Sequence, residues 1–286
     1  MKVTLLGTRG SLATSGPETL RYGGNTACVE VEGADGTLLV LDAGTGIRAL
    51  GERVARDGIR RVDLLLTHLH MDHIQGLGFF KPLYTPGFDV HIWGPPSTTM
   101  DLRKRLARYL SPPLFPVRLD DLPAMPTFHD VAREHFTIGG LEITADLVCH
   151  PGPTVGYRIG EQGAAMTYLP DHEPALATGE LPSDPDWMSG SALAADVDLL
   201  IHDAQYGEQE YGEHVGWGHS SIRHALSFAR AMRVRHLVTF HHDPSHSDEA
   251  LDEIVLAARS GGTLPFNLTP GTEGAVFEVG TPPVGA

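Results

Sequence analysis

The sequence contains few cysteines, few aromatic residues and no long apolar run. Cys28 and Cys149 are the only thiols in 286 residues, which excludes the disulfide framework of a small secreted domain. No apolar stretch approaches the roughly 18 residues that a membrane-spanning helix needs. The apolar run at the N-terminus is too short for a signal peptide and predicts a first strand. We therefore expect a globular protein of the cytoplasm with no membrane partner.

Basic residues are also scarce. The chain has 21 lysines and arginines against 36 aspartates and glutamates, giving a net charge of −15. Long nucleic acids bind largely through phosphate contacts with Lys and Arg, so such a partner is disfavoured. A small phosphate ester is not excluded, because a metal site supplies its own positive charge. The main basic cluster lies on a helix predicted over 99–109, and we interpret it as a solvated face rather than a wall that attracts an anionic substrate.

Histidine, in contrast, is abundant, and it gathers at the ends of apolar runs. The most informative segment follows the apolar run 62–66, which is typical of a buried strand. There His68, His70, Asp72 and His73 lie within six positions. Imidazole and carboxylate together suit zinc and similar divalent ions. The segment therefore predicts a metal site at a strand end.

Later strands end in the same kinds of residue. The apolar runs 147–149, 166–169, 197–201 and 236–240 lead to His150, Asp171, His202-Asp203 and His241-His242. We expect these side chains to line one edge of a sheet sandwich, where active sites of layered folds are common. The sequence also predicts a strand over 38–41 with a tight Gly-rich turn, a helix over 47–55 and a hairpin formed by 136–138 and 141–145.

The His-x-His-x-Asp-His segment after an apolar strand resembles the signature of the metallo-β-lactamase superfamily. Within that superfamily, the chain looks like the ribonuclease Z-like and small phosphodiesterase branch. The resemblance runs from about residue 3 to about residue 278, and its motif is specific for the superfamily but much less so for the substrate. It implies an α/β fold, the four-layer αββα sandwich, formed by a single domain over 1–286.

The resemblance also implies two divalent metal ions and their ligands. His68, His70 and His150 correspond to the ligands of the first ion, whereas Asp72, His73 and His241 correspond to those of the second. Asp171 resembles the bridging aspartate, although Leu169-Pro170 and His172 flank it where the family has Ser-Gly and Thr. His241 is favoured over His242, and whether His172 or His242 assists the site is left open. Zinc is the favoured ion, with manganese and iron as alternatives.

Two further segments bear on the chemistry. His219 precedes Ser220 and Ser221, either of which can cap a predicted helix. This segment resembles the His-Ser-Thr segment of the ribonuclease Z-like branch, whose histidine donates a proton to the leaving oxygen. Asp203 stands where that branch has a glutamate that orients this histidine, and it is one methylene shorter. The implied catalytic residues are His219 and Asp203, together with the ligand Asp72.

The expected activity is hydrolysis of small phosphodiesters, with cyclic nucleotides or other cyclic phosphates as candidates. In many members of the family an RNA-gripping arm lies between the positions of His150 and Asp171, and here two strands and a turn fill that segment. A ribonuclease Z-type endoribonuclease and a lactonase or thioesterase on the same scaffold are the alternatives, and a non-enzymatic sensor is a third. The sequence leaves the physiological substrate and the oligomeric state, a homodimer included, open.

Overall fold

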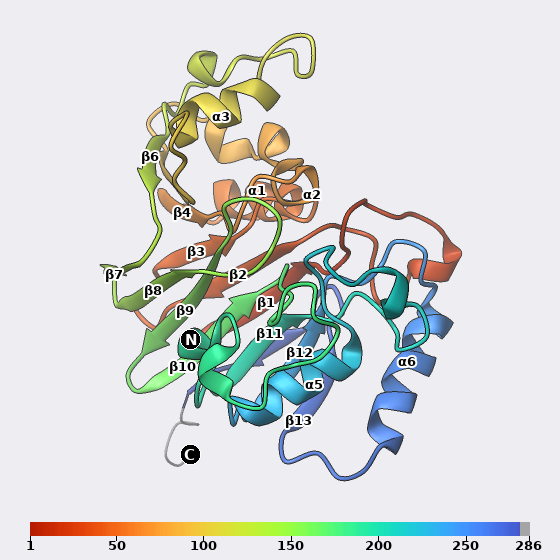
Figure 1. Ribbon diagram of the computed structural model, residues 1–286. Coiled ribbons are helices and arrows are strands. Elements are labelled where there is room, and N and C mark those ends of the chain that lie inside the picture. Colours follow the sequence, from red (N-terminus) through yellow and green to blue (C-terminus); the bar gives the residue numbers. More distant parts are fainter. Residues whose placement is uncertain (281–286) are drawn as a thin grey trace.

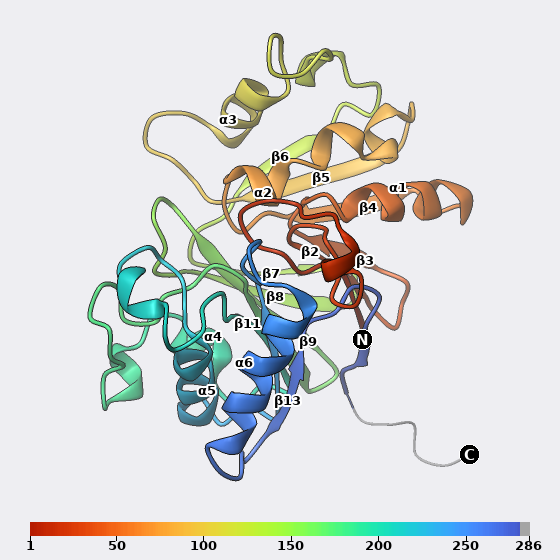
Figure 2. The ribbon, with the colours of Figure 1, turned by 90° about the vertical axis from the view of Figure 1, so that its right-hand side faces the viewer.

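Two β-sheets lie face to face in the computed structural model, and helices cover their outer faces (Figure 1). The structure describes residues 1–280. The view turned by 90° places α1 and α3 beyond one sheet and α4, α5 and α6 beyond the other (Figure 2). This arrangement of helix, sheet, sheet and helix confirms the predicted αββα sandwich.

The N-terminal sheet contains seven strands in the order β14-β1-β2-β3-β4-β5-β6. Its first four strands in that order pair antiparallel, and β3 to β6 run parallel. The strands are β1 (Lys2–Gly7), β2 (Cys28–Glu32), β3 (Leu38–Leu41), β4 (Arg61–Leu65), β5 (Asp89–Gly94), β6 (Thr127–Asp130) and β14 (Val276–Glu278).

The C-terminal sheet also has seven strands, in the order β13-β12-β11-β10-β9-β8-β7. Strands β7 to β10 pair antiparallel, whereas β10 to β13 run parallel. The strands are β7 (Glu134–Ile138), β8 (Leu141–Leu147), β9 (Val155–Glu161), β10 (Ala164–Leu169), β11 (Leu199–Asp203), β12 (His236–Phe240) and β13 (Asn267–Pro270).

The helices connect these strands and pack on the outer faces of the sheets. The α-helices are α1 (Ile47–Arg56), α2 (Met71–Ile74), α3 (Leu102–Tyr109), α4 (Ser191–Ala194), α5 (Ile222–Ala231) and α6 (Asp248–Ser260). Short 3₁₀ turns are η1 (Pro17–Thr19), η2 (Leu77–Phe79), η3 (Lys81–Tyr84), η4 (Leu119–Asp121), η5 (Pro185–Trp187) and η6 (Tyr211–Glu213). None of the helices within residues 1–280 has the length and apolar content to cross a membrane.

Strand β3 shows why each sheet must be covered on both faces, by the other sheet on the inside and by helices on the outside. Leu39 and Leu41 belong to the core between the sheets, whereas Leu38 and Val40 belong to the core beneath α1. Alternate side chains of a strand point to opposite faces, so a strand that is apolar throughout must be covered on both. Each fully buried leucine contributes on the order of 1.5–3 kcal/mol to folding.

The strand directions explain where the functional residues gather. Strand β8 runs in the same direction as β10, because both pair antiparallel with β9. Strands β11 and β12 are parallel to β10. The carboxyl ends of these four strands therefore meet at one edge of the C-terminal sheet, and the end of β4 contributes from the facing sheet.

The main elements predicted from the sequence are present. The expected helix over 47–55 is α1, and the hairpin is β7 with β8. The helix expected over 99–109 begins later, at Leu102, because the Asp101 carboxylate accepts a hydrogen bond from the Lys104 amide and caps it. The first strand, β1, also forms as expected.

Candidate metal centre

The segment after β4 turns sharply, so its ligand-type residues reach the gap between the sheets. Thr67 lies two residues after the end of β4, and its amide donates to the Asp42 carboxylate. His68 and His70 lie in the loop that follows, and Asp72 and His73 lie in the short helix α2. The sequence spacing thus becomes a cluster that faces the ends of β8, β10 and β12.

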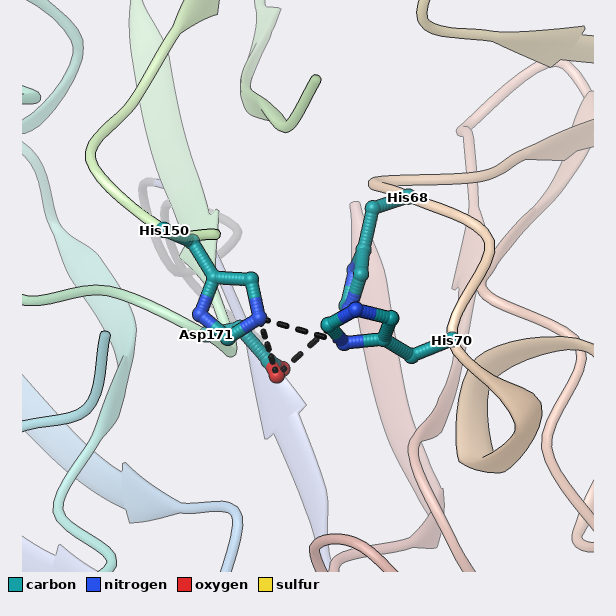
Figure 3. A group of neighbouring side chains, drawn as sticks. All are labelled: His68, His70, His150 and Asp171. Atoms are coloured by element: carbon teal, nitrogen blue, oxygen red, sulfur yellow. Dashed lines mark hydrogen bonds and ion pairs between the residues drawn. The ribbon is translucent and has the colours of Figure 1, made fainter. Parts of the chain in front are cut away.

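A first group of ligand-type atoms comes from His68, His70, His150 and Asp171, which are drawn in Figure 3. Asp171 Oδ2 lies 3.6 Å from His68 Nε2 and 3.6 Å from His150 Nε2. His150 Nε2 lies 3.2 Å from His70 Nδ1. The two sheets thus face each other across this group, with His68 and His70 on one side and His150 on the other.

A second group comes from Asp72, His73, His241 and the same Asp171. His73 Nε2 lies 3.3 Å from Asp72 Oδ2 and 2.9 Å from Asp171 Oδ1. His241 Nε2 lies 3.1 Å from Asp72 Oδ2 and 3.3 Å from Asp171 Oδ1. Asp171 therefore directs one oxygen to each group, as a bridging carboxylate would.

The spacing of these atoms fits two metal ions. Zinc binds nitrogen and oxygen at about 2.0–2.2 Å, so tetrahedral ligand atoms lie about 3.3–3.6 Å apart. Most of the separations given above fall within or close to that range. His68 Nε2, His73 Nε2 and Asp171 Oδ1 are moreover buried without a hydrogen-bond partner. Buried polar atoms are costly when unsatisfied, and a cation between them would remove that cost.

Four of the five imidazoles in the two groups also have a hydrogen-bond partner for their second ring nitrogen. In each case the ring nitrogen that faces away from the group has a partner at hydrogen-bond distance. The four pairs are His68 Nδ1 with Thr67 Oγ1 (3.1 Å), His73 Nδ1 with Asp42 (2.7 Å), His150 Nδ1 with the Gly218 carbonyl (2.8 Å) and His241 Nδ1 with Gln205 Oε1 (2.9 Å). Metal-binding histidines usually have such a partner, which fixes the ring and its tautomer.

Asp42 was not predicted from the sequence, where it appeared only as part of a tight turn. It has a positive φ of 58° and is fully buried. Its carboxylate accepts hydrogen bonds from Thr67, from His73 Nδ1 and from the Tyr168 hydroxyl at 3.1 Å. Its position after an apolar strand was the available signal, because the other functional residues also follow strand ends.

The electrostatics of the site favour positive charge. Burial disfavours a charged imidazole at His73, but the carboxylates of Asp171, Asp72 and Asp42 outweigh this effect and raise its pKa well above the ordinary value. Burial also opposes ionisation of Asp171, yet the neighbouring histidines His241, His73 and His68 hold its pKa well below the usual range. Ionised carboxylates around a buried point are what a cation site requires.

His219 and Asp203 form a separate pair beside the ligand groups. His219 Nδ1 lies 2.7 Å from Asp203 Oδ2, so the shorter aspartate does reach the imidazole. Burial opposes charge on His219, but the charge of Asp203 and its hydrogen bond outweigh this and raise the pKa of His219 to about 9. The His219 ring stacks on that of His241 with 4.9 Å between centroids.

The sequence offered two serines as the cap of the helix that follows His219. Ser221, not Ser220, caps α5 by accepting a hydrogen bond from the His224 amide.

The two histidines whose roles the sequence left open lie behind the centre. His242 is buried, and its Nε2 lies 2.8 Å from the Gly271 carbonyl. His172 is also buried, with its Nδ1 2.9 Å from His202 Nε2 and its amide donating to Asp203 Oδ2. Neither belongs to a ligand group found within residues 1–280. His242 instead contacts the loop that follows β13, and His172 contacts β11.

Comparison with known proteins identifies a matching family, related sequences and similar structures. Residues 37–242 match the family described as the β-lactamase superfamily domain. The chain is 26% identical over 304 residues to ribonuclease Z of Haloarcula marismortui, and the match covers 91% of each protein. Among solved structures, the metallo-β-lactamase fold protein YhfI from Bacillus subtilis is similar with a TM-score of 0.68 at 18% identity, covering 98% of both chains. A diphosphatase from the PhnP family is similar with a TM-score of 0.67 at 20% identity, covering 97% of both.

Proposed function

The chain belongs to the β-lactamase superfamily, and on that basis we propose that it is a dinuclear metal-dependent phosphodiesterase that hydrolyses small phosphodiesters, with cyclic nucleotides or other cyclic phosphates as candidates. The observation that carries this proposal is the His219–Asp203 pair beside the two ligand groups. Cleavage of a phosphodiester releases a poor alkoxide leaving group, which benefits from a positioned general acid. A lactone or thioester has less need of a separate imidazole acid.

We assign the ligand residues as the sequence predicted them. His68, His70 and His150 would hold one ion, Asp72, His73 and His241 the other, and Asp171 both. The imidazole and carboxylate ligands favour zinc, with manganese or iron as alternatives. When bound, two divalent ions supply the activation of water and the neutralisation of phosphate charge.

The pair itself handles the proton. Because His219 Nδ1 faces the Asp203 carboxylate, Nε2 is the ring atom available to give a proton to the departing oxygen. The other oxygen of Asp203, Oδ1, accepts from the amides of Gln205 and Ser220 at 3.0 and 3.1 Å. The carboxylate is therefore fixed from both sides, and it orients the imidazole and stabilises the proton that the imidazole carries.

The restriction to small substrates rests on two features. Strands β9 and β10 fill the segment between His150 and Asp171, and only a short turn joins them, so no arm for RNA is present there. The basic helix α3 is largely neutralised by acidic neighbours. The ion pairs are Arg103 with Asp120 (2.6 Å), Lys104 with Asp101 (2.9 Å) and Arg105 with Asp130 (4.0 Å). These pairs support our interpretation of α3 as a solvated face.

The second candidate is a ribonuclease Z-type activity. It is favoured by the curated relatives that carry that name, the H. marismortui protein among them. The two candidates share the metal centre and the proton donor, so they differ only in how the rest of the substrate is held. The diphosphatase of the PhnP family shares the fold, so the likeness of fold does not itself select RNA.

The test is a comparison of kcat/KM on metal-loaded protein. The substrates are adenosine 3′,5′-cyclic phosphate, a precursor transfer RNA at moderate salt, a lactone and a thioester. We expect the small phosphodiester to be preferred over both acyl substrates and the RNA. Specific and efficient cleavage of the precursor RNA would select the second candidate, and turnover of the acyl substrates alone would reject both.

A further inference from the structure

Trp217 combines an exposed side chain with a tightly held backbone. The residue is 60% exposed, although it lies only two positions from His219. The amides on either side of it, those of Gly216 and Gly218, donate to the two oxygens of Glu173 at 3.0 and 2.9 Å. Glu173 is 1% exposed. A buried carboxylate thus clamps the backbone that presents an indole to solvent.

Glu173 accepts two further hydrogen bonds, and the backbone that it holds also contacts a proposed metal ligand. Glu173 Oε1 also accepts from the Ala177 amide at 2.9 Å and from the Tyr211 hydroxyl at 3.2 Å. The Gly218 carbonyl in turn lies 2.8 Å from His150 Nδ1. Gly218 has a φ of 90°, and a Cβ there would lie 2.7 Å from His150 Nδ1, so only glycine fits. The position of Trp217 is therefore coupled to that of a proposed metal ligand.

The indole is supported on one side by a row of rings. Trp217 meets His214 edge to face with 4.9 Å between centroids, and His214 stacks on Tyr206 at 4.2 Å. Tyr206 lies 6.2 Å from the His219 ring. Consecutive Cα atoms are about 3.8 Å apart, so the Cα atoms of Trp217 and His219 are at most about 7.6 Å apart. The indole and the proposed proton donor are therefore carried by one short segment with a fixed backbone, and our inference places the base of a nucleotide whose phosphate lies at His219 against this indole.

Two more exposed apolar side chains belong to residues adjacent in sequence to residues of the centre. Leu12 is 61% exposed and follows Ser11, whose amide donates to Asp72 Oδ2 at 2.8 Å. Met71 is 49% exposed and lies between His70 and Asp72 in the sequence.

We propose that Trp217 is a stacking platform for a planar aromatic group, and that the substrate class is therefore a phosphodiester that bears a nucleobase. The inference rests on the proposed function, because it assumes that the phosphate binds between the two ligand groups. A nucleobase stacks well on an indole whatever its hydrogen-bonding pattern, so this platform selects nucleotides over aliphatic diesters without selecting one base.

The kinetic test uses two six-membered cyclic phosphodiesters. Adenosine 3′,5′-cyclic phosphate carries a base, and trimethylene phosphate does not. In Trp217→Ala, the ratio of kcat/KM for the first substrate to that for the second should fall about tenfold, equivalent to about 1.4 kcal/mol and typical of base–aromatic stacking. Trp217→Phe keeps an aromatic ring and should restore most of the ratio. Trp187→Ala is the matched control, because Trp187 is 79% exposed and lies in η5, and it should leave the ratio unchanged.

A binding measurement separates failure of this inference from failure of the proposed function. Calorimetry on metal-loaded protein compares adenosine 5′-monophosphate with ribose 5-phosphate. We expect the monophosphate with the base to bind more tightly, and Trp217→Ala to remove that advantage, even if neither cyclic diester is hydrolysed. Equal affinities of the wild-type protein for the two ligands, or an advantage that survives Trp217→Ala, would overturn the platform whatever the turnover results.

Discussion

The two sheets contribute to the centre in different ways. The N-terminal sheet places four ligand-type residues within the six positions from His68 to His73. The C-terminal sheet supplies its residues from the ends of four separate strands, namely His150, Asp171, Asp203 and His241. The first set depends on a local turn, and the second depends on the register of β8, β10, β11 and β12.

The two halves of the chain also differ in the chemical roles that we propose for their residues. The residues after β4 hold ions in our proposal, whereas the C-terminal half of the chain supplies the bridge, Asp171, and the proton-donating pair of His219 and Asp203 as well as ligands. A compact motif can therefore identify a metal site, but what the site does is decided by residues dispersed along the other half of the chain. Substitutions in each half of the chain and removal of the metal test this division.

Asp171→Ala should have the largest effect, because both ligand groups share this residue. We expect occupancy of both ions to fall and kcat to decrease by more than about 100-fold, since even outer partners of metal ligands cost 10–100-fold. Elemental analysis with kinetics is the measurement. Asp198→Ala is the matched control, because Asp198 precedes β11 at the opposite edge and pairs with Arg235. Full metal content in Asp171→Ala would remove the bridging role.

Asp42→Asn should have a smaller effect on the same centre. Asparagine replaces one carboxylate oxygen with an NH₂ group that cannot accept a hydrogen bond, so the contacts to Thr67 and His73, which use different oxygens, cannot both be kept. We therefore expect metal affinity to fall about 10–100-fold. A competition titration with a zinc chelator measures this. Asp63→Asn is the control, because Asp63 is also buried, lies on the adjacent strand β4 and binds Trp93 Nε1 and Arg61 instead. Equal losses in the two variants would indicate a general packing defect.

Removal of the metal tests the same centre through the stability of the fold. The apo protein keeps His68 Nε2, His73 Nε2 and Asp171 Oδ1 buried without partners. Ions at 100 times their Kd would stabilise the fold by about 2.7 kcal/mol per site. Because about 1 kcal/mol shifts Tm by roughly 2–4 °C in a large domain, we expect the apo Tm to fall by at least several degrees. Scanning calorimetry before and after chelation measures it, and an unchanged Tm would argue against buried ion sites.

The sequence predicted the local part of this centre best. The spacing of residues 68–73 predicted a metal site, and the family resemblance supplied the proposed ligand roles of these residues and of His150, Asp171 and His241. The αββα sandwich followed from the same resemblance, with strands and helices placed by apolar periodicity. These features are local in sequence, so a single chain suffices to recognise them.

The missing parts depend on contacts between distant segments. Asp42 binds Tyr168, which is 126 positions away, and nothing in the segment around Asp42 identifies that partner. Glu173 likewise satisfies donors spread from Ala177 to Gly218. Their environment exists only after the two sheets have packed. Such positioning residues are therefore found in the structure and not in the motif.

If His219 donates a proton to the leaving group, its loss should matter only for leaving groups that need a proton. Two phosphodiesters of equal charge, one losing an alkoxide and the other losing nitrophenolate, are assayed with His219→Ala and Asp203→Asn at verified metal content. We predict a loss in kcat of roughly 10²–10⁴-fold on the alkyl ester in His219→Ala. The loss should be much smaller on the nitrophenyl ester, because that group needs no proton, and Asp203→Asn should show the same pattern more weakly. Near-normal rates on the alkyl ester, or equal losses on both esters, would contradict the account.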